Sequence, residues 1–177
     1  MTLLNQMQIS SLSGWKPVYF IVVVVLCNGC NDYTRELSGG YFYWDEGGQS
    51  RAIQSHHSEN ESVWGEVLDY DYSSEYIVIL QCPSHDEYVN MVAFYLEDDT
   101  LRYPQASRLS HDKSEHDADS IVSTDPRYTR IFANKYNYWI VSHKAHKVFG
   151  PYTKTEYWQK RKELDVPECL ELRDEPK

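Results

Sequence analysis

Apolar and polar residues follow strand-like patterns over much of the chain. Residues 41–53 predict a hairpin, because strand-forming aromatic residues run into a glycine-containing turn at 45–48. In residues 68–72, apolar and acidic side chains alternate, so one face of the predicted strand is apolar and the other is acidic. A serine turn leads into Tyr76–Leu80, whose uninterrupted apolar run is typical of a central strand buried on both sides.

Two more segments extend the predicted sheet. Residues 89–96 form an apolar run that we expect to be a further strand. Residues 136–152 predict a second hairpin with its turn near 144–146. Together these patterns indicate an antiparallel meander of about five to seven strands.

Helix signals are concentrated after residue 123. Thr124 or Asp125 can cap a short helix that starts at Pro126 and ends near residue 133. Thr153 and Glu156 have the spacing of a capping box, which predicts a helix over residues 154–164. The sequence therefore predicts an α+β fold, mainly an antiparallel β meander sheet with the C-terminal helix packed on it.

The remaining segments are polar. Residues 104–123 are mostly polar and charged, and Leu109, Ile121 and Val122 are their only large apolar residues. We expect this stretch to be a long, mobile insertion within a single domain at 40–172. Residues 30–39 are expected to be a tether, and residues 173–177 a charged tail.

An apolar run near the N-terminus indicates an export signal. Val18–Leu26 is nine residues long, which is about 14 Å of helix and too short to cross a bilayer. This length suits the apolar region of a secretory signal, and Lys16 supplies the positive charge before it. We therefore predict that residues 1–29 are a signal peptide, with Met7 as an alternative start.

Two cysteines follow this run in the sequence Cys27-Asn28-Gly29-Cys30. The motif resembles a bacterial lipobox, in which a small residue such as Gly29 precedes an acylated cysteine. Cys27 departs from that pattern, which usually has leucine or valine there. We predict cleavage before Cys30 and lipidation of Cys30, for example with palmitate, on the exported side of a bacterial membrane. Alternatives are cleavage without lipidation and a redox or metal pair.

The charge balance excludes some partners. The chain has 17 basic and 27 acidic residues, a net charge of −10. Nucleic-acid binding depends on a basic surface, so we expect no nucleic-acid partner. Outside the lipobox, Cys82 and Cys169 are the remaining cysteines. An exported protein can pair them in a disulfide, and two separate thiols are the equally weighted alternative.

Three stretches share a pattern with known sequences: CNDYTRELSGGYFYWDEGG at 30–48, DYDYSSEYIVILQC at 69–82 and YWIVSHKAHKVFGPYTKTEYWQKRKELDVP at 138–167. They resemble a group of small, uncharacterised bacterial lipoproteins. The resemblance covers most of the chain after Cys30, with residues 104–123 outside it. It implies a lipid anchor and a compact domain, and it brings no activity and no catalytic residues.

Candidate chemistry is sparse. His111, His116, Asp117 and Asp119 are close in sequence and of metal-ligand type, but they lie in a segment without periodicity, so a solvated acidic loop is the favoured interpretation. Asp45, Glu46, Asp69 and Asp71 could supply a glycosidase pair, and a turn and an outward strand face explain them better. Nothing distinguishes Ser38 or Cys82 as a nucleophile, and we expect no catalytic residue and no cofactor.

Aromatic residues are the most unusual feature. The chain contains 15 Tyr and 5 Trp, and exposed Tyr and Trp side chains bind sugars or protein partners. The candidate ligand face comprises Tyr41, Tyr43, Trp44, Tyr70, Tyr72, Tyr136, Tyr138 and Trp139. Cross-strand aromatic pairs that stabilise the sheet are the favoured alternative.

These observations predict a membrane-anchored envelope lipoprotein that acts through protein–protein contacts. Its expected partners are the membrane, through the lipid, and an unknown envelope protein. An alternative is a tethered domain that binds a glycan or another small ligand through a Tyr/Trp face. A third hypothesis is a metal-dependent hydrolase built on the histidines and aspartates of residues 104–123.

Overall fold

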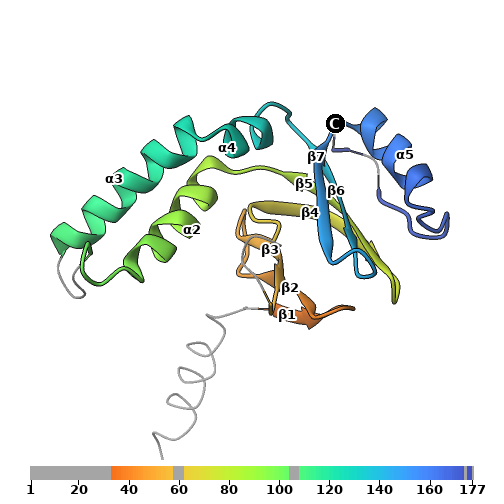
Figure 1. Cartoon of the computed structure of the whole chain (residues 1–177), viewed down its shortest axis with the longest axis horizontal. Helices are drawn as coiled ribbons and strands as arrows, with labels where there is room; N and C mark the ends of the chain where they lie inside the picture. Colours follow the sequence, from red (N-terminus) through yellow and green to blue (C-terminus); the bar gives the residue numbers. More distant parts are fainter. Residues whose placement is uncertain (1–32, 58–61, 104–107, 174, 177) are drawn as a thin grey trace, which may run out of the picture. The chain divides into compact units, whose positions relative to one another are not determined.

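The computed structural model describes residues 33–57, 62–103, 108–173, 175 and 176 (Figure 1). These residues belong to one compact unit. Its first sheet has the strand order β1-β2-β3, with β1 (Tyr33–Glu36), β2 (Tyr41–Asp45) and β3 (Arg51–Ser55). The second sheet has the order β4-β5-β6-β7, with β4 (Glu66–Tyr72), β5 (Tyr76–Cys82), β6 (Asn137–Ser142) and β7 (Lys147–Tyr152). The described helices are α2 (His85–Glu97), α3 (Arg108–Thr124), α4 (Pro126–Ile131) and α5 (Lys154–Glu163).

All strand pairs are antiparallel, and the predicted α+β fold is confirmed. The two predicted hairpins are β2–β3 and β6–β7, and the predicted serine turn joins β4 to β5. The described strands form two meanders rather than one, because the chain passes from β3 to β4 with a single bridge between Ile53 and Val63. The first sheet contributes to the core the face that carries Tyr41, Tyr43 and Ile53.

The second sheet is buried on both faces. Ile77 and Ile79 of β5 point into a core shared with the first sheet, α2 and α3, whereas Val78 and Leu80 point into a core covered by α5. All four side chains are at most 1% exposed. The prediction of a central strand buried on both sides is therefore confirmed, and each such side chain contributes about 1.5–3 kcal/mol through burial.

The C-terminal helix α5 begins as predicted. The Thr153 backbone N–H donates to Glu156 Oε2 at 2.8 Å, and the Glu156 N–H donates to Thr153 Oγ1 at 3.3 Å. The helix then buries Tyr157 against Tyr138, with their ring centroids 4.9 Å apart. This packing fixes α5 on β6, and α4 likewise begins at the predicted cap, where Asp125 accepts from the Arg127 N–H.

The predicted strand at residues 89–96 was wrong, because this segment is part of α2. Asp86 and Glu87 occupy the first turn, where carboxylates interact favourably with the helix dipole. Tyr88 and Val92 are four residues apart and both buried, which is a helical spacing. The apolar run alone is compatible with a strand or a helix. The helix forms because it buries Tyr88 and Val92 in the core.

The predicted polar insertion at residues 104–123 contains α3 over most of its length. Its inner face is made by the small residues Ser114 and Ala118, both 0% exposed, together with Val122. Small residues allow α3 to lie close against α2 (Figure 1). Ser114 Oγ also donates to Glu97 Oε1 of α2 at 2.7 Å. The interpretation as a loop was wrong for residues 108–123 because it considered only large apolar residues.

The predicted tether and tail also contain ordered contacts. Residues 33–36 of the tether are the edge strand β1. In the tail, the Arg173 N–H donates to Asp69 Oδ2 at 2.7 Å and its side chain bonds to Asp69 Oδ1. The Glu171 N–H donates to Asp71 Oδ2 at 3.1 Å. The acidic face of β4 therefore holds the C-terminal segment against the sheet.

Candidate functional site

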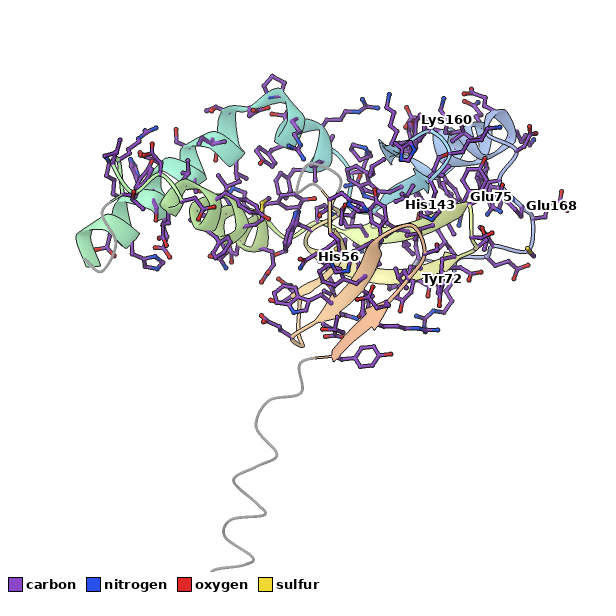
Figure 2. All side chains as sticks on the ribbon, turned by 60° about the horizontal axis from the view of Figure 1, so that its bottom comes forward. His56, Tyr72, Glu75, His143, Lys160 and Glu168 are labelled. Atoms are coloured by element: carbon purple, nitrogen blue, oxygen red, sulfur yellow. The ribbon has the colours of Figure 1, made fainter. Side chains whose placement is uncertain are left out.

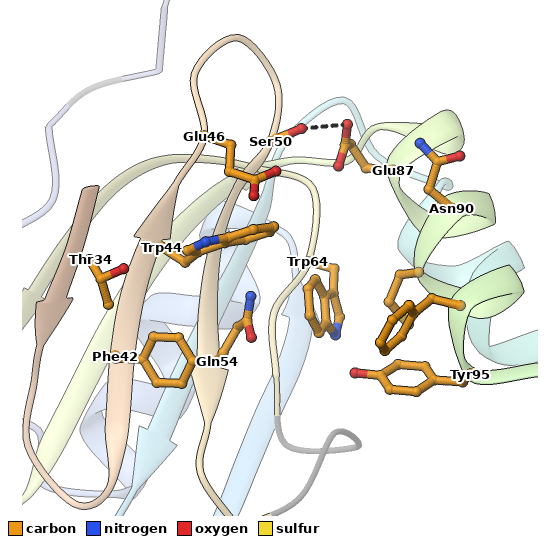
Figure 3. A pocket seen from close by; sticks show the side chains of 12 residues that line it. Thr34, Phe42, Trp44, Glu46, Ser50, Gln54, Trp64, Glu87, Asn90 and Tyr95 are labelled. Atoms are coloured by element: carbon orange, nitrogen blue, oxygen red, sulfur yellow. Dashed lines mark hydrogen bonds between the residues drawn. The ribbon is translucent and has the colours of Figure 1, made fainter. Parts of the chain in front are cut away.

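A groove opens between the first sheet and α2, with a volume of about 680 Å³. Figure 3 shows side chains from both elements around it. Its described apolar lining consists of Phe42, Trp44, Trp64, Met91, Phe94 and Tyr95. Its described polar lining consists of Thr34, Glu46, Ser50, Gln54, Glu87 and Asn90. The groove is therefore an aromatic surface with polar groups arranged around it.

One wall of the groove is the face of β2 that points away from the core. Successive side chains alternate between faces, so Tyr41 and Tyr43 point into the core while Phe42 and Trp44 point into the groove. Thr34 of β1 is opposite Trp44 in the antiparallel register, so it lies on the same face. Phe42 is further held by a stacked contact with His56, with ring centroids 4.6 Å apart. The aromatic surface is thus fixed to a sheet whose other face is core.

Trp64 closes the groove from the connection between β3 and β4. The bridge between Ile53 and Val63 fixes the preceding residue, and the Trp64 carbonyl accepts a hydrogen bond from the buried Gln81 amide. The Trp64 ring meets the Tyr95 ring of α2 edge-on, with centroids 6.4 Å apart. These contacts place an indole between the sheet and the helix.

Carboxylates set the charge of the groove. Ser50 Oγ donates to Glu87 Oε1 at 2.8 Å, which joins the start of β3 to the first turn of α2 (Figure 3). Glu46 lies on the same side of the groove. The described residues that line the groove include these two acids and no lysine, arginine or histidine. The site therefore favours cationic or neutral ligands over anions.

The predicted aromatic ligand face does not exist as one surface. Tyr41, Tyr43, Tyr138 and Trp139 are at most 9% exposed and belong to the two cores. The Tyr70 ring is tilted against the Tyr43 ring, with ring centroids 4.8 Å apart. Burial, followed by the hydrogen bond of Tyr43 to Asp45, raises the pKa of Tyr43. Tyr70, Tyr72 and Tyr136 are partly buried elsewhere. Among the eight candidates, only Trp44 lines the groove.

Five aromatic or apolar groove residues were missed from the sequence: Phe42, Trp64, Met91, Phe94 and Tyr95. Strand parity would have identified Phe42 with Trp44, because the two alternate with the core tyrosines. The α2 residues required a helix where an apolar strand was predicted. Trp64 carries no periodic signal, because it lies in an irregular connection.

The candidate metal ligands are engaged in other contacts. His111 lies 2.9 Å from Glu97 and 3.3 Å from Glu115, and these two carboxylates raise its pKa. Asp117 accepts from Tyr103 Oη at 2.7 Å, and Asp119 lies 3.7 Å from His85. His116 is exposed on α3. Within the described ranges, no three histidine, cysteine or acidic side chains are grouped to hold a metal ion.

The carboxylates considered for glycoside chemistry are also in local contacts. Asp45 accepts from Tyr43 Oη and the Gly47 N–H, and Asp69 and Asp71 bind the C-terminal segment. Glu46 is the exception, because it lines the groove. The structure thus gives Asp45, Asp69 and Asp71 structural roles.

The cysteines are separate. Cys82 at the end of β5 is partly buried and Cys169 is exposed, and both are free thiols. Burial, followed by the charge of Glu66, raises the pKa of Cys82, which disfavours its reactive thiolate. Cys27 and Cys30 lie outside the described residues, as does the predicted signal peptide at 1–29.

A serine–histidine contact joins the two sheets. Ser38 Oγ, in the loop after β1, lies 2.9 Å from Nε2 of His143. His143, which is labelled in Figure 2, follows β6 in the turn that leads to β7. Gly39 has φ +66°, and a Cβ there would overlap the His143 ring. Neither Ser38 nor His143 is among the residues that line the groove. The contact therefore acts as a link between loops.

The pKa of His143 predicts that the protein is less stable at mildly acidic pH. Burial, followed by the charge of His146, lowers the pKa of His143 below its usual 6.5. Below about pH 6.5 the unfolded chain binds the proton more tightly, so the free energy of unfolding falls as the pH is lowered. We expect His143→Gln to reduce this dependence in urea unfolding between pH 7 and pH 5. His111→Gln is the control. The pKa of His111 is raised, so its protonation stabilises the folded protein as the pH falls, and its removal should not reduce the loss of stability. An unchanged pH dependence in His143→Gln would contradict the prediction.

Comparison with known proteins gives one family match. A family model described as a protein of unknown function (DUF3997) matches residues 106–175. The match includes α3, which the sequence resemblance had left out, and it agrees with the expectation of an uncharacterised domain. Comparisons with curated proteins and with solved structures found no match. Among the described residues, none of the helices has the length and apolar character required to cross a membrane.

Proposed function

We propose that this chain is a lipid-anchored protein of the bacterial cell envelope that acts by binding a partner protein through the groove between the first sheet and α2. The observation that carries the proposal is the groove itself. It combines aromatic side chains from two elements with the carboxylates of Glu46 and Glu87. Aromatic pockets of this kind are where protein interfaces concentrate their binding energy.

The sequence supports the anchor. An apolar run of signal length precedes a lipobox-like motif, and Cys30 is its acylated position in the proposal. The edge strand begins at Tyr33, three residues later, and three extended residues span at most about 10 Å. The domain would therefore be held close to the membrane surface, where it meets partners that are themselves in or near the membrane.

The chemistry of the groove defines the partner. Phe94 is 66% exposed at its rim and Met91 is beside it on α2, so a large apolar side chain of a partner would find apolar contacts on two sides. The two carboxylates favour a lysine or arginine next to that apolar residue. The net charge of −10 also attracts a basic partner segment at long range. We therefore expect a partner segment that combines a large apolar residue with a basic residue.

An array of short peptides, probed with the detergent-extracted full-length protein, tests this proposal. Bound peptides should be enriched in combinations of an aromatic or large aliphatic residue with lysine or arginine. For the strongest of them, Glu46→Gln with Glu87→Gln should weaken binding about tenfold, and Trp44→Ala by more. Binding should also weaken as the salt concentration rises.

A matched control separates the groove from general charge effects. Glu168→Gln with Glu171→Gln removes the same charge from exposed positions of the C-terminal segment, where Figure 2 shows Glu168. This variant should retain wild-type affinity for the same peptides. Equal weakening by the two double variants would refute a role for the groove.

A second candidate ligand is a glycan. Trp44 and Trp64 offer planar rings, and Gln54 and Asn90 offer amides that can bond sugar hydroxyls in the same groove. A glycan array run beside the peptide array distinguishes the two. Binding to glycans that is lost in Trp44→Ala but kept in the double glutamine variant would favour this candidate over the protein partner.

A further inference from the structure

A second cavity, called the inner cavity below, adjoins the groove. It has a volume of about 250 Å³ and is bounded by α2 and α4. Trp64, Met91 and Tyr95 line both spaces. These three side chains are therefore the partition between the outer groove and the inner cavity. A shift of Trp64 or Tyr95 would therefore change the shape of both spaces.

Trp64 carries an unmet hydrogen-bonding requirement at this partition. Its indole Nε1 is buried, and it is the one side-chain nitrogen or oxygen atom of the described residues that is buried without a hydrogen-bond partner. Buried polar groups are almost always paired, and an unpaired donor is costly. Figure 3 shows the Trp64 ring beside Tyr95, with its nitrogen at the end nearest α2. The donor is covered in this conformation and belongs to a side chain that lines both spaces, so a shift of Trp64 or Tyr95 is needed before a bound group can reach it.

The inner cavity differs in chemistry from the groove. Arg127 is among its lining residues, and its described lining includes no carboxylate. The groove has two carboxylates and no basic residue among its described lining residues. A group that enters the inner cavity would meet apolar side chains and hydrogen-bond donors, so an acceptor oxygen suits it and a cation does not.

We propose that the inner cavity receives an apolar group bearing a neutral acceptor oxygen, and that this oxygen accepts the hydrogen bond of Trp64 Nε1–H. The proposal rests on the groove being the binding surface, and it adds an orientation. The partner's basic residue faces Glu46 and Glu87, while a carbonyl oxygen, from its main chain or from a side chain, reaches Trp64. Trp64 then determines specificity through its N–H as well as through its ring.

Two small probes of nearly equal shape test this without any peptide. Acetophenone has a carbonyl oxygen, and α-methylstyrene has a methylene group in its place. Each is titrated into the ¹⁵N-tryptophan-labelled full-length protein in detergent, and the indole N–H signals are followed by NMR. Acetophenone should bind about three- to tenfold more tightly, as expected for one hydrogen bond, and should shift the Trp64 signal downfield. Trp64→Phe identifies that signal.

The variants decide between a hydrogen bond and general apolar binding. In Trp64→Phe, which keeps a ring and loses the donor, the two probes should bind equally. Trp158→Phe makes the same change at an exposed position of α5, outside both spaces, and should leave the preference for acetophenone intact. Equal binding of both probes to the wild type, or no binding of either, would overturn the inference. If no peptide binds in the array but acetophenone still binds more tightly than α-methylstyrene, only the proposed protein partner is refuted.

Discussion

Gln81→Leu is expected to lower the free energy of unfolding by about 3–5 kcal/mol. Gln81 is 0% exposed on β5, and its amide joins the second sheet and the connection between β3 and β4 to α2. Its Oε1 accepts from Trp139 Nε1 at 2.8 Å, and its Nε2 bonds to Tyr88 Oη at 2.9 Å and to the Trp64 carbonyl. Leucine fills the volume and leaves these buried groups without partners, so the loss exceeds that of a simple cavity.

Urea unfolding of the wild type and the variant measures the effect. Gln49→Leu is the matched control, because Gln49 is exposed and its side chain accepts only from Ser84 among the described contacts. It should change stability by less than about 0.5 kcal/mol. Gln81 also holds the Trp64 backbone, so the Gln81→Leu variant should lose groove binding at urea concentrations where it is still folded. A loss of stability similar to that of Gln49→Leu would show that the network contributes little.

Cys30→Ala is expected to abolish lipidation completely. In the proposed pathway the cysteine thiol carries the lipid and defines the cleavage point, and alanine offers no nucleophile for acylation. Intact mass of the membrane-extracted wild type should correspond to a chain that begins at Cys30 and carries acyl groups. The variant should keep residues 1–29 and take up no labelled palmitate. More than one acyl chain is required for stable anchoring, so the mass also reports how firmly the domain is held.

Cys27→Ala provides the control for this prediction. Cys27 occupies a position where leucine or valine is usual in a lipobox, so alanine should leave processing and acylation at Cys30 intact. An unlipidated wild-type chain would contradict the anchor. Loss of a bound metal or of a disulfide in both variants would instead point to Cys27 and Cys30 acting as a pair.

The hairpins and the C-terminal helix could be predicted because their signals are local. The turn at Ser73 and Ser74, the continuous apolar β5 and the Thr153–Glu156 capping box each specify structure within a few residues. The helices α2 and α3 could not be predicted in this way. The apolar run within α2 is compatible with a strand as well as a helix. The buried face of α3 contains Ser114 and Ala118, which are too small to stand out in a pattern of large apolar residues.

By itself, the sequence determined the antiparallel strands, the capped α5 and the charge of −10, because strand alternation, caps and ionisable groups act over short distances. Only the tertiary structure decided which aromatic residues are available for binding. Tyr43 and Trp44 are neighbours in sequence, yet one is core and the other lines the groove, because adjacent residues of a strand face opposite sides. The groove also needed α2 to pack beside the first sheet, a contact between distant segments that no local pattern encodes.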